Sequence, residues 1–426
     1  MFKLPLPFLN TKKIRLITIL FCCGCISTGI AQKTVNLTEV LAATHRLEQI
    51  KGDSTKLSYL NDFNYNLPFI KSVQLRTETR DLLLERQEYT VRIKPNSLKA
   101  ISSQKKMFEN KIAEIEIENQ LHFNSELKKQ YFLLINHIFN KKLMNLYEEK
   151  NNQLKDKLMV LSNSIYDSNF DVRDLVSTEE ELFDTKLKLT QLREENSNQQ
   201  FVLKQLLRVS EDSVQLNHSN LILPQQILAF TMEDTLANVG LAVGLKELKL
   251  STLENEMQLS LAKEKQFFDY VQAKYGGKNS FLFNENFSLG VGINLPFFGN
   301  TRGKRGAFYF NQQLEQYELT DSRREVQEEY ILRRNAFKKA SLKYEMLQQQ
   351  IQESSISALL ETYQKIDGVS PLLILKLKIQ EHKKTIENLK SEHELYKSFI
   401  EVLSSSSVLY QRPLQNFLST SLKQIN

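Results

Sequence analysis

The near absence of glycine and proline from two long parts of the chain is the feature that most constrains its fold. Residues 96–223 contain neither residue type, and residues 307–412 contain only Gly368 and Pro371. Both parts are rich in glutamate, lysine, leucine and glutamine, which favour helix. Because glycine and proline are the residues that most often interrupt a helix, the sequence predicts helices far longer than the usual three or four turns.

Within the first of these parts, the apolar spacing is that of a coiled coil and breaks once. The spaced positions are Leu154, Leu158, Leu161 and Ile165, followed by Leu175, Thr178, Leu182, Thr185, Leu189 and Leu192. They recur in steps of three and four, as in a heptad repeat. The spacing is lost in YDSNFDVRD, which lies between the two runs. The sequence therefore predicts a helical hairpin with its tip near residues 167–173.

The second part repeats the pattern. Its spaced positions are Leu375, Ile379, His382, Ile386, Leu389, His393, Tyr396, Ile400 and Leu403. They follow YQKIDGVSPLL, in which Gly368 and Pro371 indicate a turn. A second hairpin is therefore predicted, with its tip near residues 366–373. Outbound arms of about 60–70 residues would measure about 90–100 Å.

Segments with strand-like alternation precede each hairpin. They lie near residues 69–77, 88–95, 267–275 and 287–296. The last segment, FSLGVGINLPFFG, alternates most regularly: Phe287, Leu289, Val291 and Ile293 share one face, and Ser288 with small or polar residues forms the other. Successive side chains of a strand point to opposite faces, so this strand has one apolar and one polar face.

Corresponding residues of the two halves of the sequence are separated by nearly the same number of residues. Pro95 and Pro296 lie 201 residues apart, and the tip residues Ser168 and Gly368 lie 200 apart. This periodicity predicts a tandem repeat of two strands and a long coiled-coil hairpin. The first repeat is assigned to residues 32–245, with an entry helix, strands, hairpin and connecting segment. The second is assigned to residues 246–426, with a helix, strands, hairpin and C-terminal helix.

The first 31 residues have the composition of a secretory signal peptide. Lys12, Lys13 and Arg15 precede the apolar segment ITILFCCGCISTGI, and Ala31 is a small residue before the expected cleavage. A lipidated N-terminus at Cys25 is the alternative. All three cysteines of the sequence lie inside this segment, so cleavage leaves no disulfide or thiol chemistry in the mature chain.

After residue 32, no run of 18 apolar residues occurs. If the mature chain crosses a membrane, it must do so as a closed sheet, because an open strand edge cannot face lipid. The smallest membrane barrels need eight strands, so four strands per chain would have to be pooled in an oligomer. The Phe287 row would then face lipid and the Ser288 row a water-filled lumen. A soluble hairpin with one face on a core is the alternative.

Several segments resemble the TolC family of outer-membrane channel-tunnel proteins. FSLGVGINLPFFGNTRGKRGAFYFNQQLEQYEL resembles the strand, proline and outbound-helix junction of that family, and TLANVGLAVGLKELKLSTLENEMQLSLAKEKQFF resembles the segment before its third strand. The tips resemble its pattern of tyrosine, a small residue, an acid and an aliphatic residue. In the first tip these are Tyr166, Ser168, Asp174 and Leu175.

The resemblance implies a homotrimer in the outer membrane of a Gram-negative bacterium. Its fold would be mainly α-helical, with a twelve-stranded β-barrel in the membrane that is continued by an α-helical tunnel in the periplasm. It also implies an exit duct for efflux or type I secretion that docks on a periplasmic adaptor and an inner-membrane transporter. The docking residues would lie at the tips, at Tyr166, Ser168, Asp174, Leu175, Gly368 and Leu372.

The second tip departs from the family pattern at the expected gate. Ile374 stands at the acid position and Leu377 follows on the next turn, whereas Asp171 and Asp174 lie on the first tip. Side chains near the tips crowd around the axis of a ring of chains. We therefore expect an aperture narrowed by aliphatic side chains, with an outer acidic rim.

Other constellations favour neither catalysis nor cofactor binding. GNTRGKR has one residue too few for a phosphate loop and Arg305 where serine or threonine is needed, so a basic, flexible strand-to-helix turn is expected. His382 and His393 lie about 16 Å apart on one helix, too far for one metal. We expect them to fix coiled-coil register. Glu179, Glu180 and Glu181 are expected to form a solvated acidic run.

No enzyme, metal or cofactor is expected, and the net charge of +6 from 56 basic and 50 acidic residues gives little support for nucleic-acid binding. Two other classes of protein compete with the channel. An exported coiled-coil scaffold or adhesin stalk would explain the heptads and the signal, but not strand pairs that recur with the hairpins. A periplasmic pump adaptor usually has one hairpin and a glycine-rich lipoyl-like domain.

Overall fold

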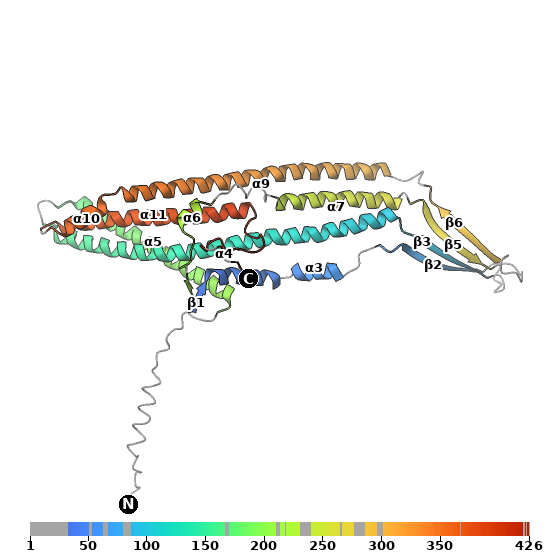
Figure 1. The fold of residues 1–426 in the computed structure, drawn as a ribbon, viewed down its shortest axis with the longest axis horizontal. Coiled ribbons are helices and arrows are strands. Elements are labelled where there is room, and N and C mark those ends of the chain that lie inside the picture. The colour runs from blue at the N-terminus through green and yellow to red at the C-terminus, as the bar shows by residue number, and fades with distance from the viewer. Residues whose placement is uncertain are drawn as a thin grey trace, which may run out of the picture.

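The computed structural model describes residues 33–50, 53–62, 67–79, 87–166, 170–209, 214–217, 219–230, 240–264, 266–276, 286–295, 301–366, 368–420, 422 and 424–425. The expected signal peptide lies outside these residues. The molecule is elongated, with a sheet at one end and the tips of two helical hairpins at the other (Figure 1). The C-terminus lies beside the helices near the middle of the long axis.

Five helices build the two hairpins. The first hairpin consists of α4 (Leu98–Asn163) and α5 (Val172–Leu207), and the second of α9 (Thr301–Gln352), α10 (Ile356–Gln364) and α11 (Pro371–Ser405). Helix α4 has 66 residues, as long as expected, but α9 has 52 and is followed by a break before α10. The break falls in Glu-Ser-Ser, where the Ile356 amide donates to the Ser354 hydroxyl at 3.4 Å.

The heptad positions of both hairpins are mostly buried. In α5 these are Thr178, Leu182, Thr185, Leu189 and Leu192, and in α11 they are Ile379, Ile386, Leu389, Tyr396, Ile400 and Leu403. Helix α11 packs against both α4 and α9, so it joins the hairpins to each other. The helices of the two hairpins run side by side (Figure 1).

A further helix, α7 (Leu241–Glu264), extends the bundle towards the sheet. It lies against α4 and α9. Asn110 of α4 donates to the Ser251 hydroxyl at 3.0 Å, and Arg323 of α9 forms an ion pair with Glu247 at 2.6 Å. Among the described helices, none is both long enough and apolar enough to span a membrane.

Four antiparallel strands form the sheet at the end of the molecule. They are β2 (Ile70–Thr79), β3 (Gln87–Pro95), β5 (Phe268–Tyr275) and β6 (Phe287–Ile293), in the order β2-β3-β5-β6. Because β3 pairs with β5, one strand pair from each half of the chain contributes to one sheet. The register shifts once in the β2–β3 pair, between residues 70 and 72, and once in the β5–β6 pair, between residues 268 and 270.

Smaller elements cover the bundle near its middle. Strands β1 (Lys33–Asn36) and β4 (Val214–Asn217) pair in parallel. The helices α2 (Leu37–Ile50) and α6 (Pro224–Leu228) are close to them in sequence, and α3 (Asp53–Asp62) follows α2 along α4 towards the sheet (Figure 1). The sequence gives no signal for the β1–β4 pair, because its partners are separated by about 180 residues of intervening hairpin.

The main core lies where this covering meets the hairpins. Phe139 of α4 and Tyr396 and Phe399 of α11 are almost fully buried there. Tyr131 is also buried, and its hydroxyl donates to the Gln415 carbonyl at 3.0 Å and accepts from the Phe417 amide at 3.2 Å. These bonds attach the C-terminal segment to α4.

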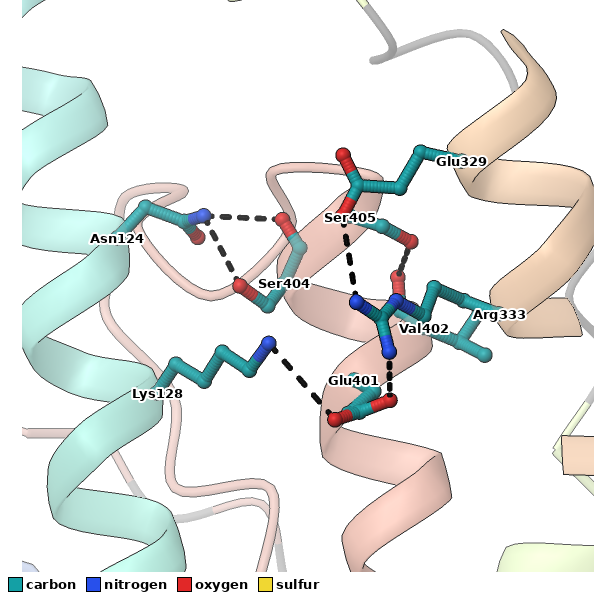
Figure 2. A network of polar contacts seen from close by, with 8 residues as sticks. All are labelled: Asn124, Lys128, Glu329, Arg333, Glu401, Val402, Ser404 and Ser405. Atoms are coloured by element: carbon teal, nitrogen blue, oxygen red, sulfur yellow. Dashed lines mark hydrogen bonds and ion pairs between the residues drawn. The ribbon is translucent and has the colours of Figure 1, made fainter. Parts of the chain in front are cut away.

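Polar contacts next to this core connect three helices. Glu401 of α11 lies between Lys128 of α4 and Arg333 of α9, at 3.9 and 2.7 Å respectively (Figure 2). Asn124 of α4 donates to the Ser404 carbonyl at 2.9 Å. A single carboxylate on α11 therefore contacts cations from both hairpins.

Candidate functional site

One face of the sheet is apolar and exposed. Phe287, Leu289, Val291 and Ile293 all lie on this face of β6, and 73% of Leu289 is exposed. The register places Tyr275, Ala273 and Val271 opposite the first three. Tyr89, Val91 and Ile93 of β3 continue the same face. A continuous exposed apolar face of this kind marks a surface that contacts lipid or another protein.

The opposite face of the sheet is polar and ordered. The Arg92 guanidinium lies 4.0 Å from the centre of the Tyr270 ring and donates to Gln272 Oε1 at 3.1 Å. Lys274 forms an ion pair with Glu88. Gly292 lies directly under Tyr270, and a Cβ atom there would clash with the ring. The glycines of β6 thus make room for the large polar side chains of β5.

The first hairpin tip begins α5 with a side-chain cap. Asp171 occupies the N-cap position, and its carboxylate accepts from the Arg173 amide at 2.9 Å. Tyr166, at the end of the preceding helix, is 98% exposed. Leu175 is half-buried. Ser168, the remaining expected tip residue, lies outside the described residues.

At the second tip, a glycine and a proline set the turn into α11. Gly368 has a φ of +90°, a conformation that favours glycine, and Pro371 is the first residue of α11. Leu372, Ile374 and Leu377 follow on the first turns of α11 and are half-buried. The two candidate aliphatic gate residues therefore share the end of the molecule with Asp171 and Asp174 of the first tip.

Two layers of charge join the hairpins near the tips. In one, the Glu181 carboxylate of α5 contacts Lys150 of α4 at 2.7 Å and Lys383 of α11 at 2.9 Å. In the other, Asp174 of α5 contacts Lys376 of α11 at 2.6 Å. Lys157 of α4 lies close enough for its charge to interact with Asp174, and its side chain is buried. We call these the Glu181 layer and the Asp174 layer.

A small apolar cluster lies on the same three helices as the two layers. It consists of Leu154, Leu182 and Ile379, one residue from each of the same three helices, with Leu158 packed against it. Each charged layer thus contains one carboxylate and two lysines near this apolar cluster. Glu179 and Glu180 are exposed, as expected for a solvated acidic run. Glu181 differs from this expectation, because it is partly covered and pairs with Lys150 and Lys383.

The pKa values of these groups reflect close pairing. The hydrogen bond from Lys376 holds the pKa of Asp174 below its usual value. Burial alone would raise the pKa of Glu181, but the bonds from Lys150 and Lys383 outweigh it and lower the pKa. Burial lowers the pKa of Lys157, and the charge of Asp174 opposes this shift. Both carboxylates therefore stay ionised in mildly acidic solution.

The two histidines of α11 make separate contacts. His382 Nε2 lies 2.7 Å from Glu149 Oε2, and its Nδ1 lies 3.3 Å from Gln153 Nε2. His393 stacks on Phe139 with ring centres 5.0 Å apart, and its Nε2 lies 2.8 Å from Asn136 Oδ1. Among the described residues, no group of three potential metal-ligating side chains occurs.

His393 makes stability depend on pH. Burial, with a smaller contribution from Lys397, lowers its pKa from 6.5 to about 4. The unfolded chain takes up this proton as pH falls through 6.5, whereas the folded chain stays neutral until about pH 4. This group should therefore reduce the free energy of unfolding by about 2 kcal/mol between pH 7.5 and 4.5. Chemical unfolding followed by circular dichroism at both pH values measures the loss.

The matched variants are His393→Phe, which preserves an aromatic ring on Phe139 and does not titrate, and His122→Phe at an exposed position. We expect only the first to reduce the loss of stability in acid. An unchanged pH dependence in His393→Phe would show that other groups are responsible.

The folded chain has the architecture of outer-membrane channels, a strand-bearing end continued by long helical hairpins. No family model and no curated protein matches the sequence, but solved channel structures match most of its length. One is the open-state outer-membrane channel MtrE of Neisseria gonorrhoeae, at 12% identity over 87% of this chain and 88% of that one, with a TM-score of 0.60.

Two other solved structures give similar values. The outer-membrane protein VceC of Vibrio cholerae has 9% identity over 87% of this chain and 96% of that one, with a TM-score of 0.58. The outer-membrane channel CmeC of Campylobacter jejuni has 12% identity over 87% and 85%, with a TM-score of 0.51. The mainly helical fold expected from the sequence, with its strand pairs and long hairpins, is confirmed, and so is the family resemblance at the level of the fold.

Proposed function

We propose that this protein is the outer-membrane exit duct of an efflux or type I secretion system. The observation that carries the proposal is the two-faced sheet at the end of a fold shared with outer-membrane channels over 87% of the chain. The apolar face suits lipid, and the polar face suits a water-filled lumen. A coiled-coil scaffold, the competing function, does not account for this sheet.

The proposed duct needs more than one chain. The described sheet ends in β2 on one side and β6 on the other, and unpaired edges are not tolerated in lipid. Three copies, joined edge to edge, would supply twelve strands. Exposed apolar residues on the helices, such as Phe183 of α5 and Tyr317 and Leu332 of α9, offer surface for packing between copies along the tunnel.

The hairpin tips are the proposed docking end for a periplasmic adaptor and an inner-membrane transporter. They lie opposite the sheet (Figure 1). Exposed Tyr166 and the positive-φ turn at Gly368 are available there, together with Leu372. The same tips would carry the gate. Ile374 and Leu377 would narrow the aperture, and a narrow aliphatic ring resists wetting.

A conductance experiment tests both the duct and its gate. The purified wild-type protein in planar bilayers should show low resting conductance. The variant Ile374→Asp with Leu377→Asp should raise that conductance severalfold, because carboxylates wet the constriction. The matched control is Lys378→Asp with Gln380→Asp, which alters neighbouring residues of the same helix.

Three results would contradict parts of the proposal. If neither wild type nor the double-aspartate variant conducts, the duct itself is wrong. If the control raises conductance equally, added negative charge rather than loss of the aliphatic ring is the cause. If Asp174→Asn opens the channel and the double-aspartate variant does not, the gate is the carboxylate of the first tip.

A further inference from the structure

Positive charge is concentrated where the helices meet the sheet. Helices α4, α7 and α9 all end beside it (Figure 1). We call the first turns of α4 and α9, residues 98–106 and 301–308, together with the last turns of α7, residues 257–264, the basic collar. Its charged residues are Lys99, Lys105, Lys106, Lys263, Glu264, Arg302, Lys304 and Arg305. The collar thus has one acid among many bases, although the whole chain is nearly balanced at 56 bases to 50 acids.

Among the residues that the structure describes, most of the collar's cations have no counter-charge. Glu264 pairs with Lys304, and Lys105 pairs with Glu109 at 3.8 Å. The other five bases form no ion pair with any residue that the structure describes. Of these, Lys99, Lys106, Lys263 and Arg302 are exposed. Arg305 Nε is shielded from solvent and finds no hydrogen-bond acceptor among the described residues.

The collar is helical rather than a flexible turn. The sequence predicted a basic, flexible connection at GNTRGKR, but α9 already begins at Thr301. Arg302, Lys304 and Arg305 are therefore held on its first turns. Lys106 lies eight residues from the start of α4, or about 12 Å along the helix axis. The cations form a shallow band and not a long charged stripe.

Exposed apolar side chains lie between this band and the sheet. Phe69 directly precedes β2, Phe267 directly precedes β5, Phe268 begins β5, and Leu98 begins α4. Each is more than half exposed, and Leu98 is 72% exposed. An apolar, aromatic border followed by unpaired cations matches the order of a bilayer interface, where acyl chains give way to headgroups.

We propose that the basic collar binds the headgroups of anionic phospholipids in the membrane leaflet that faces the periplasm. The proposal rests on the proposed function, because it needs the sheet to lie in the membrane. Lipid phosphates would supply the counter-charge that these five bases do not find among the described residues. Each lysine or arginine near an anionic membrane surface strengthens binding by roughly fivefold, and salt screens the effect.

Native mass spectrometry of the purified protein in detergent tests the collar. Phosphatidylglycerol and phosphatidylcholine with the same acyl chains are offered in equal amounts. We expect at least a tenfold preference for phosphatidylglycerol in the wild type. The preference should fall to within twofold in the variant Lys99→Gln, Lys106→Gln, Lys263→Gln and Arg302→Gln. The double variant Lys99→Gln with Arg302→Gln should be intermediate, and it serves if the fourfold variant folds poorly.

The matched control removes the same charge elsewhere. Lys155, Lys186, Lys338 and Lys339 are exposed lysines on the hairpins away from the sheet, and replacing all four with glutamine should leave the preference unchanged. An equal loss in this control would show that net charge, not the collar, selects the lipid. Loss of the preference in 10 mM inorganic phosphate, but not in sodium chloride of the same ionic strength, would indicate a free-anion site and overturn the proposal.

Insertion and conductance separate the two proposals. A wild type that neither floats with liposomes after reconstitution nor conducts would contradict the exit duct and the collar together. A wild type that inserts and conducts but retains both lipids equally would overturn the collar alone.

Discussion

Replacing Val291 with arginine should prevent stable assembly of the protein in the outer membrane. Val291 lies on the apolar face of β6, opposite Val271, and is 57% exposed. An arginine facing lipid near the bilayer middle costs about 2–4 kcal/mol. We expect the wild type to give a heat-modifiable oligomer in the outer-membrane fraction on a gel, and the variant to lose most of it.

Ser288→Arg on the same strand is the matched control. Ser288 lies on the polar face opposite Lys274, where an additional cation would be in water. We expect its oligomer yield to stay near that of the wild type, with a change in ion preference. If both variants assembled equally well, the assignment of the two faces would be wrong.

Reversing the charge at Glu181 should loosen the attachment between the hairpins. Glu181→Lys would place three lysines in a layer where the Lys150 side chain is only 11% exposed. We expect a loss of roughly 2–3 kcal/mol in the free energy of unfolding, less than for a fully buried pair because Lys383 is half-exposed. Denaturant unfolding measures the loss, and resting conductance should rise with it.

A charge swap and a neighbouring variant control this experiment. Adding Lys383→Glu to Glu181→Lys returns a carboxylate to the layer, so it should recover at least half of the lost stability. Glu180→Lys changes the exposed adjacent residue and should cost less than about 0.5 kcal/mol. If Glu180→Lys destabilised the protein as much, the Glu181 layer would not be the cause.

Local patterns predicted the long elements well. The absence of glycine and proline and the heptad spacing identified α4, α5 and α11, because helix propensity and helical periodicity are properties of neighbouring residues. The break between α9 and α10 was missed, because no glycine or proline marks it and serine disfavours helix only moderately. The β1–β4 pair was also missed, because its contacts depend on how the whole first hairpin folds back.

The candidate site was predicted only in part. The alternation of apolar and polar residues placed Phe287, Leu289, Val291 and Ile293 on one face, because the geometry of a single strand decides to which face each side chain points. The charge layers were missed, since pairing of Asp174 with Lys376 needs the register of α11 against α5, across 202 residues. A signal was nevertheless present: Lys150 and Lys157, Asp174 and Glu181, and Lys376 and Lys383 are all seven residues apart.

Because of this common spacing, the charged groups repeat once per heptad along the contact between the two hairpins. If α11 slid along α5 by a whole heptad, about 10.5 Å, one lysine of α11 would reach the carboxylate that the other lysine had left. One ion pair would then form again. Any shorter slide would leave both carboxylates without a lysine of α11 beside them. Sliding of α11 along α5 is therefore opposed at every intermediate position. We expect the tips to separate by swinging away from each other rather than by sliding.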